Sequence, residues 1–282
     1  MALVPAAGAL LLVLAGGACA NGADPVEDEA PEVEHVHGLG VDPDDPSAIY
    51  LATHLGMFRL SDDGVERRGD LFQDTMGFTV TPDGRLLGSG HPDLRDDSII
   101  NGDMAPHLGL IESSDGAVTW EPLSLQGEAD LHVIQASGDL VYGYDASNRR
   151  LLASDDLITW TTRSRLMLTS VAVDPARPRH LFATSGRLSL IESRDGGRAW
   201  TAVEGAPPLT YLSWSQDGTL GGLGPDGTFW RAAGSGFRRG SVVAGLPSAL
   251  LLSNEAWYAA TDLAVYRSDD DGRSWEVVLD LD

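Results

Sequence analysis

A unit of about forty residues recurs six times along this chain, and this repeat constrains the fold more than any other feature. Each unit contains an apolar strand, a polar turn and a second apolar strand, followed by two shorter strand-like segments. The turns, such as Pro82-Asp83-Gly84 and Gln216-Asp217-Gly218, are rich in residues that break strands. No segment has a sustained helical periodicity. The repeat therefore indicates an all-β protein built from four-stranded units.

The six units cover roughly residues 35–70, 71–128, 129–166, 167–205, 206–241 and 242–282. One small sheet cannot bury both of its faces alone, whereas a ring of such sheets supplies each with two neighbours. We therefore predict a single six-bladed β-propeller of four-stranded antiparallel blades over residues 35–282. A seventh blade would have to lie within the long second unit, which has too few strands for it.

A second signature, S-x-D-x-G-x-[TSA]-W, closes several units. It is clearest at Ser193–Trp200 and Ser268–Trp275, while residues 155–160 and 226–230 look like degraded copies. We interpret these Asp-box turns as structural, because Asp and Gly close a turn and Trp packs in the blade. The residues assigned this role are Asp115, Trp120, Asp195, Gly197, Trp200, Asp270, Gly272 and Trp275.

The N-terminal residues 1–19 form an apolar segment that is too short and too rich in Gly and Ala for a membrane span, and that fits a cleaved signal. Cys19, the only cysteine, follows Gly-Ala as in the lipobox of bacterial lipoproteins. We expect lipidation at Cys19 and a membrane anchor. Residues 20–34 are acidic and contain no base, which predicts a disordered tether. The protein is expected outside the cytoplasm, as a cell-surface or periplasmic lipoprotein or, alternatively, as a secreted protein.

The formal net charge is −23, from 42 acidic and 19 basic residues, and every base is Arg. Such a surface repels phosphate backbones, so nucleic-acid binding is not expected. The charge is compatible with cations, neutral sugars or a basic protein partner.

The histidines give the strongest functional signal. In a four-stranded meander, the turns between blades and the loops between the second and third strands share one face of the ring. Six of the seven histidines fall on that face in the first three units, and only His180 falls on the other. The candidate metal or ligand residues are His35, His37, His54, His91 and His132, with His107, Asp74, Asp93, Asp130 and Asp145 as further contributors.

His35 and His37 lie on the same side of an extended strand, with Cα atoms about 6.6 to 7 Å apart. The longest insertion, Pro92–Pro106, is acidic and lies on the same face. Imidazoles with carboxylates are a ligand set for a transition metal such as zinc or copper. Two other interpretations stay open: a pocket that contacts a sugar or a peptide, and histidines merely held by tight turns.

The Asp-box turns resemble those of the BNR repeats of sialidases, sortilin-type propellers and photosystem-II assembly propellers. The opening His35–Pro43, with Ala52-Thr53-His54 and Gly88–Asp93, is similar to secreted bacterial propellers labelled glycosylhydrolase or exo-sialidase. This resemblance implies the propeller fold and a glycosidase-like activity. Sialidase activity in particular is not expected, because the sequence shows no Tyr–Glu pair on the histidine face.

We therefore expect a membrane-anchored propeller that acts as a ligand-binding or assembly module through its histidine face, with a glycan or a protein as partner. The first alternative is a glycosidase-like hydrolase that uses the same face. The second is a protein-docking scaffold without a small-molecule site.

Overall fold

The computed structural model describes residue 1 and residues 32–93, 95, 105–186 and 188–281. All strands fall within one compact unit, Pro31–Asp282. The predicted leader with Cys19, most of the tether and most of the Pro92–Pro106 insertion lie outside the described residues. Within the described ranges, the chain contains no helix with the length and apolar character needed to cross a membrane.

The described residues form six four-stranded sheets, each made of strands consecutive in sequence and antiparallel to their neighbours. Blades 1 and 2 consist of β1 (Val36–Val41), β2 (Ile49–Thr53), β3 (Gly56–Ser61), β4 (Gly64–Arg68), β5 (Asp74–Val80), β6 (Leu86–His91), β7 (Leu110–Ser113) and β8 (Glu121–Ser124). Blades 3 and 4 consist of β9 (Leu131–Ser137), β10 (Leu140–Asp145), β11 (Arg150–Ser154), β12 (Thr161–Ser164), β13 (Leu168–Val173), β14 (Leu181–Ser185), β15 (Leu190–Ser193) and β16 (Thr201–Ala202). Blades 5 and 6 consist of β17 (Tyr211–Trp214), β18 (Leu220–Leu223), β19 (Thr228–Ala233), β20 (Gly236–Val242), β21 (Pro247–Leu252), β22 (Trp257–Thr261), β23 (Ala264–Ser268) and β24 (Glu276–Asp280).

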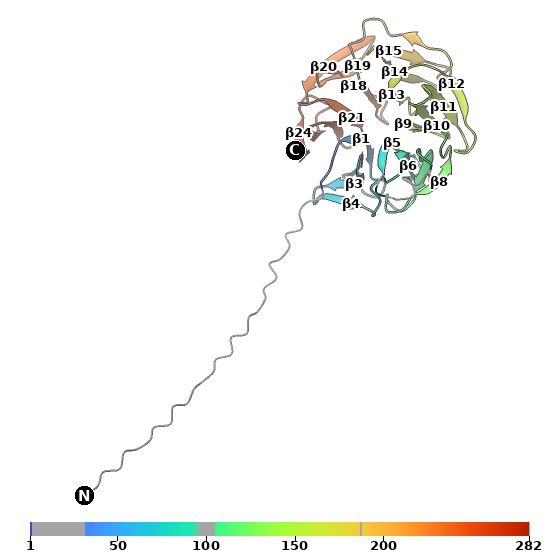
Figure 1. Ribbon diagram of the computed structural model, residues 1–282. Coiled ribbons are helices and arrows are strands. Elements are labelled where there is room, and N and C mark those ends of the chain that lie inside the picture. The colour runs from blue at the N-terminus through green and yellow to red at the C-terminus, as the bar shows by residue number, and fades with distance from the viewer. Residues whose placement is uncertain (2–31, 94, 96–104, 187, 282) are drawn as a thin grey trace. The chain divides into compact units, whose positions relative to one another are not determined.

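The sheets are arranged as the blades of a propeller, with the first strand of each blade nearest the axis and the fourth at the rim (Figure 1). The prediction of an all-β, six-bladed propeller is therefore confirmed. The inner strands mix buried and partly exposed residues, whereas the second strands are buried along most of their length. This pattern is expected where the second strand packs between two neighbouring blades.

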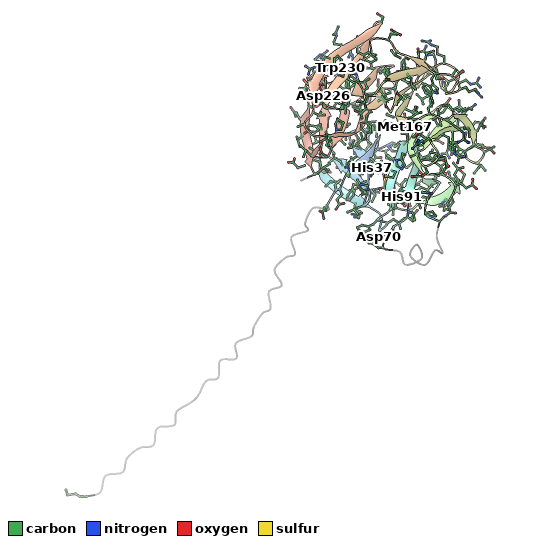
Figure 2. All side chains as sticks on the ribbon, turned by 45° about the horizontal axis from the view of Figure 1, so that its top comes forward. His37, Asp70, His91, Met167, Asp226 and Trp230 are labelled. Atoms are coloured by element: carbon green, nitrogen blue, oxygen red, sulfur yellow. The ribbon has the colours of Figure 1, made fainter. Side chains whose placement is uncertain are left out.

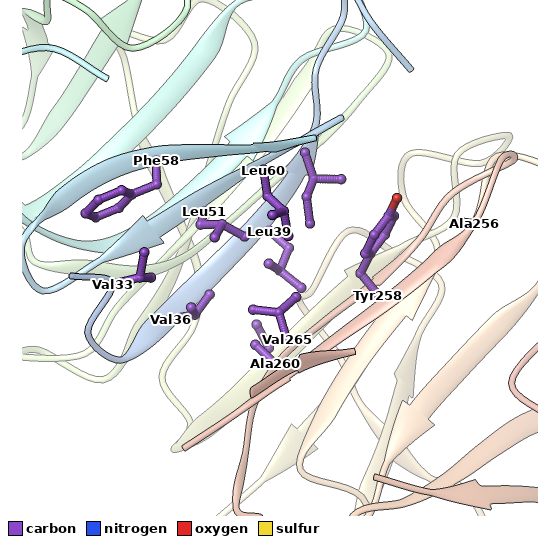
Figure 3. Close-up of a cluster of buried hydrophobic side chains, with 12 residues drawn as sticks. Val33, Val36, Leu39, Leu51, Phe58, Leu60, Ala256, Tyr258, Ala260 and Val265 are labelled. Carbon is purple, nitrogen blue, oxygen red and sulfur yellow. The ribbon is translucent and has the colours of Figure 1, made fainter. Parts of the chain in front are cut away.

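The ring closes through an apolar cluster between blades 1 and 6 (Figure 3). Val36 and Leu51 of blade 1 pack there with Ala260 and Val265 of blade 6, and all four are nearly inaccessible to solvent. Val33 belongs to the same cluster, so the packed chain begins two residues before the predicted boundary at His35. Side-chain packing, rather than an exchanged strand, joins the first and last blades in the part of the chain that the structure describes.

The Asp-box turns have the structural role predicted for them. Asp115 Oδ1 accepts hydrogen bonds from the backbone N–H of Thr119 (2.9 Å) and from Ser113 Oγ (2.9 Å). The turns at Asp195 and Asp270 repeat this arrangement. The turn at Asp156 keeps the bond from the serine, but it is one residue shorter: Asp156 Oδ1 accepts the N–H of Thr159, three residues on, which fits a degraded copy. Non-glycine residues adopt a positive φ in three of these turns, at Ala117 (66°), Leu157 (63°) and Asp271 (61°).

The Asp-box tryptophans contact the preceding blade as well as their own. Trp200 of blade 4 donates from Nε1 to Ser164 Oγ of blade 3 (3.2 Å), and Trp160 of blade 3 donates to Ser124 Oγ of blade 2 (3.0 Å). These indoles join consecutive blades at the rim of the ring.

Candidate functional site

A β-bulge near the start of the inner strand leaves one residue out of the strand register in five of the six blades. The bulged residues, which are left out of the strand register, are His37, Met76, His132, Thr169 and Ser248. A bulge leaves its extra residue unpaired and redirects the side chain. The same local irregularity therefore places a histidine at the channel in blades 1 and 3.

The first cluster, which we define as His35, His37, His54 and Asp74, lies between blades 1 and 2. His37 Nε2 is 3.2 Å from His54 Nδ1, and Asp74 Oδ1 is 2.9 Å from His54 Nδ1 and 3.4 Å from His37 Nε2. The His35 ring stacks on the His54 ring, with centroids 5.3 Å apart. In Figure 2, His37 lies near the centre of the ring.

Three potential ligand atoms face one another in this cluster. The carboxylate oxygen of Asp74 only accepts hydrogen bonds, so His37 and His54 satisfy it with a proton on the facing nitrogen. In the other tautomer of either ring, a nitrogen lone pair faces the carboxylate oxygen. A metal cation accepts all three lone pairs, and ligand atoms on a tetrahedral zinc are about 3.3 Å apart. The separations of 2.9 to 3.4 Å among His37 Nε2, His54 Nδ1 and Asp74 Oδ1 are close to this ligand–ligand distance.

Asp74 is the centre of the histidine network. Burial alone would raise the pKa of Asp74, but hydrogen bonds with His37, His91 and His54 outweigh it and hold the pKa well below its usual range. Asp74 is therefore a carboxylate at neutral pH. Burial, reinforced by the neighbouring His37 and His54, lowers the pKa of His35, which favours the neutral form that can bind a metal.

The second cluster, which we define as His91, His107, Asp130 and His132, lies between blades 2 and 3. His91 Nδ1 is 3.4 Å from Asp74 Oδ2, and His91 Nε2 is 3.8 Å from Asp130 Oδ2. His132 Nε2 donates to Asp130 Oδ2 at 2.9 Å. The hydrogen bond with Asp74 outweighs burial and raises the pKa of His91. The structure thus brings the six candidate histidines together with two of the candidate aspartates.

Two other candidate aspartates have different partners. The carboxylate of Asp93 binds Arg95 and accepts the Phe72 N–H. The carboxylate of Asp145 is fully buried and binds Arg150 at 2.7 Å. The backbone next to Asp145 does reach the second cluster, because the Ala146 N–H donates to the Asp130 carbonyl. His107 lies three residues before β7.

The axis of the ring holds a narrow channel of about 90 Å³. His37 and His132 line it together with residues that the sequence analysis did not single out: Met76, Thr169 and Tyr211. Each of these lies near the start of an inner strand, and this shared position is the signal that could have identified them. A wider cavity of about 450 Å³ lies at the opposite, Asp-box end of the inner strands, lined by Gln135, Trp214 and Glu255 among others.

Fold and site together define a six-bladed Asp-box β-propeller with a histidine-lined channel mouth. No family model matches the chain. A curated xyloglucanase from Paenibacillus sp is 26% identical over 289 residues, which cover 88% of this chain but 27% of that protein. The chain thus spans about a quarter of the length of this relative.

Solved structures show the same fold. The GH74 xyloglucanase from Xanthomonas campestris superposes with a TM-score of 0.56 at 17% identity, over 88% of this chain and 46% of that one. YCF48 bound to a D1 peptide superposes with a TM-score of 0.55 at 14% identity, over 88% of this chain and 82% of that one. The chain is thus a β-propeller similar to Ycf48-type and xyloglucanase-type propellers.

Proposed function

We propose that this protein is a ligand-binding or assembly propeller that holds a transition-metal ion, zinc or copper, at the first cluster. One observation carries the proposal: His37 Nε2, His54 Nδ1 and Asp74 Oδ1 converge within 3.4 Å of one another. His35 offers a further ring nitrogen within 4.8 Å of those of His37 and His54. Three imidazoles and one carboxylate are a donor set that suits zinc and copper and is poor for calcium or magnesium.

The position of the cluster supports a binding role. The side chain of His54 is 44% exposed, so an ion bound there is accessible from the surface, while His37 (11% exposed) holds it from within. A metal at this place can complete its coordination with a donor group from a partner. YCF48, a propeller of similar fold, is known in complex with a D1 peptide. By analogy, we propose a peptide or a glycan as the partner of this face.

Metal titration of the full chain tests the proposal. Carrying Cys19→Ser in every sample removes the only thiol as a competing ligand. We expect Zn²⁺ and Cu²⁺ to bind with defined stoichiometry, measured by elemental analysis and by competition with a chromophoric chelator. His37→Ala should lose an ion, and Asp93→Asn, which changes an acid of blade 2 that binds Arg95, should not. Failure of the wild type to retain any ion, or unchanged affinity in His37→Ala, would refute the metal site.

We further propose that the protein is carried out of the cytoplasm and anchored by lipid at Cys19. Support comes from the apolar segment 1–19 and its lipobox-like end. Labelling with a radioactive fatty acid in a bacterial host should modify the wild type and leave Cys19→Ser unlabelled. A wild-type protein that takes up no label would contradict the anchor and leave secretion as the alternative.

A glycoside hydrolase is the second candidate function. The sequence similarity to a xyloglucanase favours it, and Asp74 and Asp130 lie on either side of His91 as a carboxylate pair. The channel on this face, at about 90 Å³, is small for a sugar ring, which ranks this candidate second. Hydrolysis of xyloglucan oligosaccharides by the wild type, abolished in Asp130→Asn, would reverse the ranking.

A further inference from the structure

The second cluster contains two buried polar atoms that find no partner among the residues that the structure describes. They are His107 Nδ1 and Asp130 Oδ1. An unpaired buried donor or acceptor costs about 1–3 kcal/mol, and more when it is charged. The side chain of Asp130 is only 7% exposed, so bulk water does not relieve the cost. Both atoms belong to residue types that bind transition metals.

We infer that His91, His107 and Asp130 bind a second transition-metal ion, coupled to the first through Asp74. This inference rests on the proposed function, because it extends the metal at the first cluster to a pair of sites. Each of the three residues offers a ligand atom within 4.8 Å of the other two. The rings of His91 and His107 are tilted by 51°, with centroids 5.5 Å apart, so they do not stack face to face. The ligand atoms are close enough together for one ion to contact all three.

Asp74 provides the coupling because its two oxygens face different clusters. Oδ1 contacts His37 and His54, whereas Oδ2 faces Nδ1 of His91. When His91 donates its Nδ1 proton to Asp74, its Nε2 carries a lone pair on the side of Asp130. Carboxylates commonly fix the tautomer of a metal-binding histidine in this way. Asp74 is thus a ligand of the first ion and a positioning residue for the second.

The two sites also join consecutive blades. The first ion would connect His37 and His54 of blade 1 with Asp74 of blade 2, and the second would connect His91 of blade 2 with Asp130 of blade 3. A hydrogen bond joins blades 2 and 3 near this point: Ser89 Oγ in β6 accepts the Leu131 N–H in β9 at 3.0 Å. This hydrogen bond holds the strand ends that carry His91 and Asp130 next to each other.

Stoichiometry in matched variants tests the inference. We titrate the full chain carrying Cys19→Ser with Zn²⁺ alone and count bound ions by equilibrium dialysis and elemental analysis. The wild type should bind two ions, His107→Ala one, and His54→Ala one. Asp130→Asn, which keeps the side-chain shape, should also bind one ion and serves as the second variant if His107→Ala does not fold. Asp93→Asn should keep both ions.

The outcomes separate this inference from the proposed function. A wild type with one ion, lost in His54→Ala but kept in His107→Ala, would overturn the second site and leave the first; the unpaired atoms would then be satisfied by water. A wild type with no ion would overturn both sites. Two ions that both persist in His107→Ala and in Asp130→Asn would overturn the assignment of the ligands.

Discussion

Replacement of Asp74 by Asn provides the sharpest test of the paired site, because one substitution removes two different contacts. Asn has nearly the same shape but lacks the charge, and one of its two terminal groups is a donor. At the first cluster it loses a metal ligand. At the second it loses the carboxylate that orients His91. The two sites should therefore weaken by different amounts.

The expected magnitudes follow from these two roles. A four-ligand structural zinc site contributes about 10–16 kcal/mol, or about 2.5–4 kcal/mol per ligand, which corresponds to roughly two to three orders of magnitude in Kd. Loss of a partner that only orients a ligand costs about 10–100-fold. We therefore expect Asp74→Asn to weaken the first site by about tenfold more than the second.

Competition titrations with a chromophoric chelator at fixed pH and ionic strength resolve the two affinities. Asp130→Asn, which should affect only the second site, identifies which measured constant belongs to which cluster. Asp93→Asn is the control for loss of one acid from the same blade. Equal weakening of the two sites in Asp74→Asn, or no weakening of either, would refute the assignment of Asp74 as ligand and positioning residue.

Three further predictions concern the frame that holds the site. Phe229→Ala, at a side chain only 1% exposed, should lower the free energy of unfolding by about 3–5 kcal/mol in urea titrations, and a loss below about 1 kcal/mol would contradict its place in the core. The hydrogen bond from Thr119 is foremost in lowering the pKa of Asp115 from 3.8 to about 2, so the stability that Asp115 contributes is present above about pH 4 and is lost as the pH falls toward 2. Thermal melts of Asp115→Asn should therefore depend less on pH in that window; an unchanged slope would exclude the effect. Gly77→Ala would place a Cβ atom 2.1 Å from the Leu131 carbonyl oxygen across the blade 2–3 interface, so its melting temperature should fall, and a wild-type value would contradict the close approach.

The fold was predictable because its signals are local. Turn residues and alternating apolar strands recur in every unit, and each blade uses only strands that are consecutive in sequence. The Asp-box at Asp156 is harder to see in the sequence because it is one residue shorter than the others and has Leu157, not Gly, at a positive φ. A pattern of residue types does not reveal that a non-glycine residue adopts a positive φ.

The sequence predicts which face of the ring carries the histidines, but it does not predict which side chains contact one another there. Strand periodicity placed His35 and His37 on one side of a regular strand, whereas β1 begins at Val36 and bulges at His37. Bulges depend on how the second strand pairs, which no single segment encodes. Nothing in the sequence distinguishes Asp74 from Asp145 as a candidate ligand. The structure shows that the carboxylate of Asp74 faces histidines, whereas that of Asp145 binds Arg150.

The way the ring closes has a consequence for its motions. Five of the six blade interfaces are bridged by a chain connection, while the interface between blades 6 and 1 is held by the packing of side chains such as Val36 and Ala260. Parting of the ring at this seam would expose apolar side chains without breaking a strand hydrogen bond, because β1 and β21 pair only within their own blades. The two histidine clusters span other interfaces, between blades 1 and 2 and between blades 2 and 3. Bound ions would link blades 1, 2 and 3 to one another and would add no link between blades 6 and 1.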